Sequence, residues 1–138
     1  MIGAKKNDGV TVLDFMPERP PLEEITARAG TVLTGETPVA SEAMVVKGLR
    51  TVYDPEIPIN IYDLGLIYSL DINTSGFVKI SMTLTAPGCP VAEIMPKMIA
   101  DAAANVEGVG EVEVQLVWDP PWSKNLMSED AKLALGIL

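Results

Sequence analysis

Apolar residues recur at the spacing of an amphipathic helix in three stretches of the chain. The predicted helices cover residues 40–52, 91–106 and 128–135. Ser41 or Thr37 is available as the N-cap of the first helix, and Pro55 follows its end. Pro96 falls inside the second stretch and predicts a bend in that helix. The third stretch is short and predicts a helical tail that closes the chain before Gly136.

Alternation of apolar and polar residues predicts three strands. The predicted strands cover residues 66–72, 78–85 and 112–118. The turn Asn73-Thr74-Ser75-Gly76 joins the first two as a hairpin, whereas the third follows the second helix and should run parallel to its neighbour. The order helix, strand, strand, helix, strand, tail predicts an α/β (α+β) fold, a small three-stranded mixed sheet with helices packed on it.

Residues 1–39 show no sustained period, because short apolar pieces alternate there with glycine and proline. This segment is predicted to be an N-terminal extension with little regular structure. Residues 40–138 are expected to form one domain, since 138 residues with 48% hydrophobic content suffice for a single core.

Charge and hydropathy exclude several classes of function. Lys and Arg number 10 against 19 Asp and Glu, and the formal net charge of -9 repels nucleic-acid backbones and anionic lipid heads. No run approaches the roughly 18 apolar residues of a membrane span, and no apolar signal-peptide stretch follows Lys5 and Lys6. We therefore expect a cytoplasmic protein that binds neither nucleic acid nor membranes.

Cysteine and histidine usage narrows the chemistry further, because the chain has one cysteine, Cys89, and no histidine. A single thiol cannot form an internal disulfide, and the usual ligands of a zinc site are missing. Cys89 stands between a predicted strand and a predicted helix, where unpaired backbone N–H groups and the helix dipole favour the thiolate. Nearby carboxylates such as Glu93 oppose that effect. A buried, unreactive cysteine is the alternative interpretation.

Six of the eleven prolines fall in three loops that each flank a strand end. These loops cover residues 54–58, 86–90 and 119–122. In the predicted topology the three strand ends share one edge, so the loops should converge around Cys89. Asp54 and Glu56 then become candidate supporting groups, with solvated loop acids or turn caps as the alternative. The residues that complete this predicted site are Thr85, Pro87 and Pro90.

Two further segments call for an interpretation. Trp118-Asp119-Pro120-Pro121-Trp122 follows the third strand, and its indoles either pack into the core or present a docking surface for partner proteins. Asp63 and Gly65 are expected to organise a turn into the first strand, with Gly65 permitting backbone angles that other residues avoid.

Four segments resemble the signature motifs of the small iron-sulfur assembly domains of the SufT and PaaD type. They are Asp54-Pro55-Glu56-Ile57-Pro58, Asp63-Leu64-Gly65-Leu66-Ile67-Tyr68, Thr85-Ala86-Pro87-Gly88-Cys89-Pro90 and Val117-Trp118-Asp119-Pro120-Pro121-Trp122. The resemblance covers residues from about 40 to the C-terminus. It implies an α/β fold, a role in maturing iron-sulfur proteins, a reactive Cys89 and a functionally important Glu56. The chain lacks the cysteine-rich C-terminal tail of some PaaD-type members, so the SufT-like branch fits better.

The resemblance also implies partners, namely the iron-sulfur assembly machinery and apo client proteins. An iron-sulfur cluster normally takes four thiolate ligands, so one cysteine per chain cannot hold a cluster stably. The leading hypothesis is therefore a cluster assembly or delivery factor, with Cys89 as transient metal ligand or contact and no tightly bound cofactor. A homodimer would contribute two Cys89 thiolates, with Asp54, Glu56 or an external thiol completing the shell.

Three alternative functions stay open. The first is an adaptor that recruits client proteins without touching iron. The second is an accessory factor for maturation of a multicomponent oxygenase. The third is an enzyme with Cys89 as nucleophile, against which the missing histidine counts, since the usual proton acceptor is absent.

Overall fold

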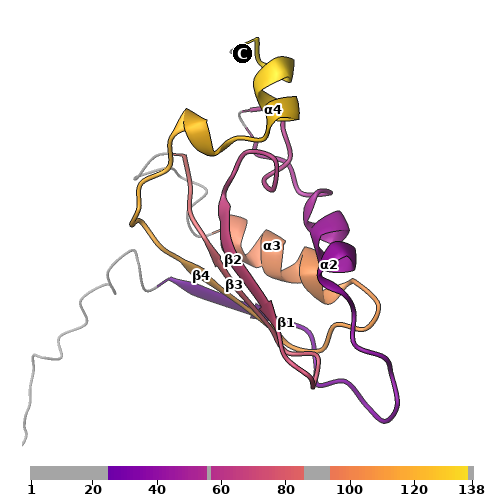
Figure 1. Ribbon diagram of the computed structural model, residues 1–138. Coiled ribbons are helices and arrows are strands. Elements are labelled where there is room, and N and C mark those ends of the chain that lie inside the picture. The colour runs from indigo at the N-terminus through magenta and orange to yellow at the C-terminus, as the bar shows by residue number, and fades with distance from the viewer. Residues whose placement is uncertain (1–24, 56, 86–93, 137–138) are drawn as a thin grey trace, which may run out of the picture.

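Four strands form one mixed sheet, and two helices cover one of its faces (Figure 1). The computed structural model describes residues 25–55, 57–85 and 94–136. In chain order the elements are β1 (Thr26–Ala29), α2 (Glu42–Leu49), β2 (Ile67–Ile72), β3 (Val78–Met82), α3 (Met95–Ala104) and β4 (Val112–Leu116). A 3-10 turn (Lys124–Leu126) and the short helix α4 (Glu129–Ala134) follow. No helix in these ranges is long and apolar enough to cross a membrane.

The strand order is β1-β4-β3-β2. β2 and β3 form the predicted antiparallel hairpin, and β3 pairs in parallel with β4, as a crossover through α3 requires. β1 pairs antiparallel with β4, from Thr26 opposite Gln115 to Ala29 opposite Val112. The mixed α/β class is confirmed, and the sheet has four strands where the sequence predicted three.

The fourth strand, β1, lies in the segment 1–39, for which the sequence predicted little regular structure, and the sequence analysis did not predict it. Its sequence, Thr-Ala-Arg-Ala, contains two alanines and no large apolar side chain. Periodicity could not find it because the pattern depends on bulky inward-facing residues. Backbone pairing with β4 holds this strand in place.

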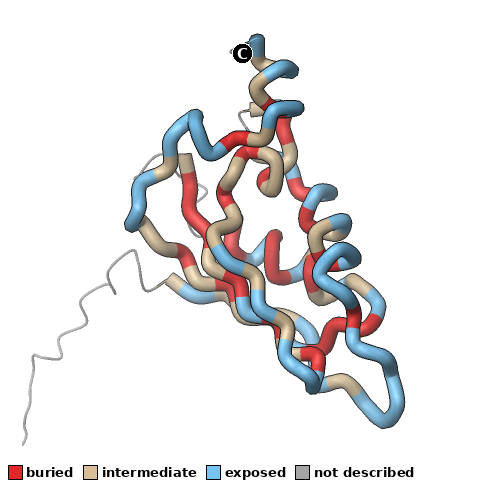
Figure 2. Tube along the Cα trace, viewed as in Figure 1, coloured by how far each residue is buried: buried red, intermediate tan, exposed pale blue. Residues whose placement is uncertain are grey.

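The core fills the space between the sheet and the two helices (Figure 2). Its innermost side chains come from the two central strands and from the inner sides of both helices. They include Val78, Ile80 and Met82 on β3, Val112, Val114 and Leu116 on β4, Leu49 on α2 and Ile99 on α3. Burying one side chain of this size contributes about 1.5–3 kcal/mol, so this layer is the main source of stability.

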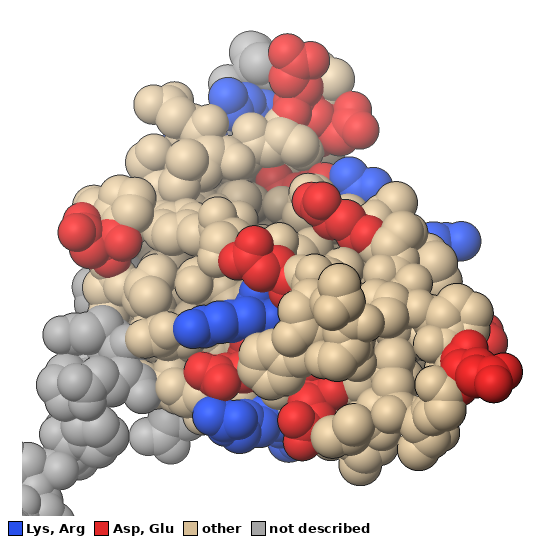
Figure 3. Space-filling view, turned by 60° about the horizontal axis from the view of Figure 1, so that its bottom comes forward, with Lys and Arg blue, Asp and Glu red and all other residues tan. Residues whose placement is uncertain are grey.

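The other face of the sheet is polar and carries a row of alternating charge. Across the four strands the register aligns Asp71, Lys79, Glu113 and Arg28. Arg28 Nη2 lies 3.0 Å from Glu113 Oε1. Basic and acidic side chains also lie beside one another on the face shown in Figure 3. Opposite charges on neighbouring strands favour this register on a face that no described helix covers.

Helix starts follow the expected capping chemistry, with one correction. Ser41 Oγ accepts a hydrogen bond from Met44 N at 3.3 Å at the start of α2. α3 begins at Met95, so Pro96 lies in its first turn and does not bend it. Proline fits there because the first N–H groups of a helix have no partner within the helix. The part of this helix predicted before residue 94 lies outside the described residues.

Candidate functional site

β2 begins, and β3 and β4 end, at one end of the sheet, which we call the site end. Thr83 N donates to Leu66 O at 2.8 Å, and Val117 N donates to Met82 O at 2.8 Å. The three chains therefore stay side by side as they leave the sheet. The predicted convergence of these three strand ends is confirmed. The C-terminal segment, defined as residues 119–134, lies at the same end (Figure 1).

Cys89 lies outside the described residues, as do its predicted companions Glu56, Pro87 and Pro90. Their part in a site therefore stays a prediction. Thr85 is half-buried and follows β3 at the site end. The described residues that flank the Cys89 segment in the chain are Thr85, after β3, and Ile94, just before α3. Within the described ranges, no group of three or more His, Cys, Asp or Glu side chains is placed to hold a metal ion.

Asp54 is half-buried, and its carboxylate turns back onto its own proline loop. Its Oδ1 accepts a hydrogen bond from Ile57 N at 3.0 Å, and its backbone N–H donates to Ile59 O at 3.2 Å. These contacts are typical of an aspartate that holds a turn. They favour the capping interpretation, and the ligand role of Asp54 stays a prediction.

Asp63 and Gly65 shape the turn that enters β2, as the sequence predicted. Asn60 Nδ2 donates to Asp63 Oδ2 at 2.9 Å, and Asp63 N donates to Asn60 Oδ1 at 2.8 Å. Gly65 has a φ of 82°, which lies in the left-handed region that favours glycine. A Cβ at this position would overlap the backbone of Leu126. The turn is therefore shaped to receive the C-terminal segment.

Three hydrogen bonds fasten the C-terminal segment to the chain around the start of β2. They run from Trp122 Nε1 to Leu64 O (2.7 Å), from Tyr68 Oη to Pro120 O (2.8 Å) and from Ser128 N to Asp63 O (2.8 Å). Trp122 also packs against the core, so it acts as an internal anchor. Between the two indoles, Asp119, Pro120 and Pro121 are exposed at the site end. Partner docking at these three residues stays a prediction.

The alternation pattern predicts Tyr68 in a strand, and the sequence resemblance includes it in a signature motif without giving it a role. The pairing of β2 with β3 shifts register between Ile67 and Ser69. A bulge of this kind redirects the side chain it contains, here toward the loop after β4. Burial and the nearby Asp119 carboxylate raise the pKa of Tyr68. The hydroxyl therefore stays protonated and keeps its hydrogen bond at neutral pH.

Two buried polar atoms at the site end, Thr83 Oγ1 and Trp118 Nε1, have no hydrogen-bond partner in the part of the chain that the structure describes. Thr83 is completely buried, although the alternation of β3 assigns it to the polar face. An unpaired buried donor costs about 1–3 kcal/mol, so such atoms tend to mark places that another group completes. Sequence analysis missed Thr83 because its burial depends on neighbours distant in the chain.

The two indoles allow a matched pair of substitutions. Trp122→Phe is expected to lower the free energy of unfolding by about 1 kcal/mol more than Trp118→Phe, because only the former loses a hydrogen bond and leaves Leu64 O without its donor. Both changes remove the same ring volume, so the volume effect largely cancels. Urea unfolding of the two variants measures the difference. Equal losses would show that the Trp118 N–H has a partner of similar strength.

Comparison with known proteins identifies a family whose members are similar to this chain. The model of a family described as "Iron-sulfur cluster assembly protein" matches residues 42–114, from the start of α2 into β4. An "Fe-S protein maturation auxiliary factor" of Porphyromonas gingivalis is 50% identical over 98 residues, which cover 71% of this chain and 93% of that protein. The "Fe-S protein maturation auxiliary factor SufT" of Staphylococcus aureus is 40% identical over 86 residues, covering 62% of this chain and 98% of that one.

A solved structure agrees with these matches. The crystal structure of a domain of unknown function from Bacillus anthracis superposes with a TM-score of 0.65 at 41% sequence identity, over 70% of this chain and 92% of that one. Its agreement with the fold described above, together with the motifs around Asp54, Asp63, Cys89 and Trp118, is consistent with the sequence resemblance to SufT-type domains. The chain belongs to the family of iron-sulfur cluster assembly proteins.

Proposed function

We propose that this protein helps deliver iron-sulfur clusters to client proteins during their maturation, with Cys89 as a transient ligand or contact. The family match carries the proposal, because residues 42–114 contain the only cysteine of the chain together with β3 before it and the start of β4 after it. Relatives at 50% and 40% identity are named maturation auxiliary factors. The cluster is cargo in this function and is handed on to the client.

The residues of the site end support transfer better than storage. One thiolate per chain falls short of the four that hold an iron-sulfur cluster firmly. Asp54 already accepts a hydrogen bond from Ile57 N, so an external thiol or a second Cys89 from another copy suits the remaining positions better. The unpaired donors Thr83 Oγ1 and Trp118 Nε1 follow β3 and β4 at this end, and they fit a site that another molecule completes.

Anaerobic reconstitution tests the role of Cys89. The protein is incubated with ferrous iron and sulfide, and transfer to an apo-ferredoxin is followed by visible absorbance. Cys89→Ser is expected to slow transfer by about tenfold or more, since even changes to groups that support metal ligands cost about 10- to 100-fold. Met98→Leu is the matched control, because it removes an exposed sulfur atom on α3 that is not a thiol.

Equal transfer by the wild type and Cys89→Ser would remove the ligand role. The adaptor hypothesis would then be favoured if capture of apo-ferredoxin survived Cys89→Ser and failed after substitution of Trp118 or Trp122. Loss of transfer in Met98→Leu as well would indicate that a surface, and not the thiol, had been disturbed.

A further inference from the structure

In the part of the chain that the structure describes, backbone groups on the outer edge of β2 have no partner strand. β2 is the last strand of the sheet, and among the described residues it pairs with β3 alone. Asn73 N donates inward to Phe77 O at 3.0 Å, and alternate residues of an antiparallel strand face the same side. The N–H and C=O groups of Leu70 and Ile72 therefore point outward, away from β3. This edge offers hydrogen bonds to another strand.

Natural edge strands are normally protected against such pairing, usually by proline, lysine or a covering segment. The six residues of β2, Ile-Tyr-Ser-Leu-Asp-Ile, include neither proline nor lysine. The other edge strand, β1, is shorter and carries Arg28, whose side chain is paired with Glu113. β2 itself has two protective features, the bulge at Tyr68 and the charged Asp71, so the part open to pairing is the regular stretch from Ser69 to Ile72.

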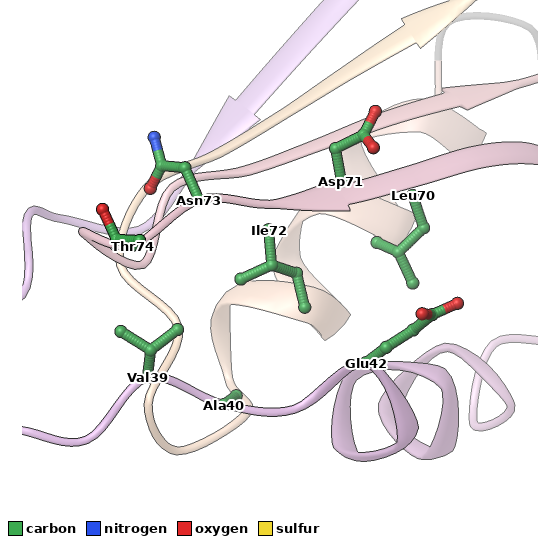
Figure 4. A pocket seen from close by; sticks show the side chains of 8 residues that line it. All are labelled: Val39, Ala40, Glu42, Leu70, Asp71, Ile72, Asn73 and Thr74. Atoms are coloured by element: carbon green, nitrogen blue, oxygen red, sulfur yellow. The ribbon is translucent and has the colours of Figure 1, made fainter.

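A groove runs below this edge between β2 and the start of α2 (Figure 4). Its main part has a volume of about 620 Å³. Leu70 and Ile72 point down into it from the strand, toward Val39 and Glu42 on the opposite wall (Figure 4). A smaller hollow of about 140 Å³ continues along Ile67–Leu70. The groove therefore follows the whole length of β2, which is the shape that an extended segment needs.

The apolar floor of the groove is incompletely covered. Val78 and Ile80, the neighbours of Ile72 and Leu70 on β3, are 0% exposed. Leu70 and Ile72 lie in the same layer but are only half-buried. The two helices already cover this apolar layer over β3 and β4. Apolar side chains of an added strand would extend the cover to Leu70 and Ile72.

The rim of the groove is acidic. Glu42 in the first turn of α2 and Asp71 on β2 both line it, and no ion pair of either is found among the described residues. In Figure 4 the Asp71 carboxylate rises above the strand, and the Glu42 side chain lies along the opposite wall. With a net charge of -9 on the whole chain, the rim selects for a basic partner.

We propose that an extended segment of a partner protein, with alternating apolar and basic side chains, binds here as a fifth strand along β2. Its backbone pairs with the N–H and C=O groups of Leu70 and Ile72, and its apolar side chains fill the groove. Its basic side chains lie on the opposite face of the strand, beside Asp71, while Glu42 adds negative charge at the groove wall. Strand addition of this kind derives affinity from main-chain hydrogen bonds and specificity from the alternate side chains. Because β2 begins at the site end, the added strand would bring the partner to the end of the sheet where β3 and β4 finish.

A synthetic peptide of seven alternating valine and lysine residues is the probe, and it contains no iron, so the result is independent of the role of Cys89. Fluorescence anisotropy measures its dissociation constant, and NMR hydrogen exchange measures protection of individual amides. We expect binding that slows exchange at Leu70 and Ile72. Methylation of the peptide nitrogens that face β2 should abolish binding, whereas methylation of the alternate nitrogens should leave it intact.

The charge at the rim has its own matched control. Glu42→Gln combined with Asp71→Asn is expected to weaken binding by about threefold, as expected for one exposed charge pair at Asp71 and a weaker, longer-range attraction by Glu42. Glu107→Gln combined with Glu129→Gln makes the same change in net charge at exposed acids outside the groove and should leave the affinity unchanged.

Four results would overturn the proposal. The peptide could fail to bind at millimolar concentration, or bind without protecting the Leu70 and Ile72 amides. The two double variants could weaken binding equally, which would indicate general electrostatic attraction. Protection of these amides in the free protein, with a dimer in sedimentation, would assign the edge to a second copy of this chain.

Discussion

Gly65→Ala is expected to lower the free energy of unfolding by about 3 kcal/mol, one of the two largest effects predicted for this chain. The left-handed φ of 82° costs a residue with a Cβ about 1–2 kcal/mol. Overlap of that Cβ with the Leu126 carbonyl adds a packing strain of about 1–3 kcal/mol, because the obstacle is backbone and cannot rotate away. Urea unfolding monitored by tryptophan fluorescence measures the loss.

Gly35→Ala is the matched control for this effect. Gly35 also has a positive φ, 59°, but a Cβ there would meet nothing within 4 Å. Gly35→Ala should lower the free energy of unfolding by about 1 kcal/mol, because only the left-handed backbone conformation is unfavourable there. Alanine also restricts the unfolded chain, which offsets part of this loss. Equal losses for the two variants would contradict the close approach of the C-terminal segment to the turn at Gly65.

Ile80→Ala is expected to destabilise the protein by about 3–4 kcal/mol, because Ile80 is 0% exposed at the centre of the sheet and its truncation leaves a cavity. Ile72→Ala removes the same atoms from the neighbouring strand. Its cost should be about 1–2 kcal/mol, since Ile72 is half-buried at the groove and solvent can fill the space. Chemical denaturation of both variants gives the comparison.

The difference between these isoleucines also tests the groove. A loss for Ile72→Ala as large as that for Ile80→Ala would show that the floor below β2 is already covered in the free protein. The valine-lysine peptide would then have no apolar surface to fill. A small loss for Ile72→Ala leaves this surface available to a partner strand.

Local patterns predicted the parts of the fold that local residues control. The hairpin was predictable because alternation brackets a polar turn ending in Gly76, whose φ is 89°. Ser41 was predictable as the cap of α2 because its hydroxyl reaches a backbone N–H three residues ahead. The turn role of Asp63 and Gly65 was also predictable from local residues, since Asp63 hydrogen-bonds with Asn60 three residues before it and the missing Cβ of Gly65 permits its positive φ.

Features controlled by distant residues were missed. β1 depends on pairing with β4, and its small side chains gave no pattern to find. Pro96 was placed inside a helix because sequence alone did not show that α3 begins at Met95. Thr83 was expected at a polar face and is completely buried. The contact of Tyr68 with Pro120 depends on a register shift that alternation does not reveal.

The sequence by itself determined the class of the fold, the antiparallel and parallel pairing of the predicted strands, and hence which strand ends share the site end. It also carried the family motifs and the single Cys89 on which the proposed transfer depends. The tertiary structure decided that β2 is an edge strand of the described sheet, that a groove lies below it, and that Trp122 and Tyr68 hold the C-terminal segment. The physical reason is that periodicity and capping act between near neighbours, whereas edges, grooves and anchors depend on which distant surfaces meet.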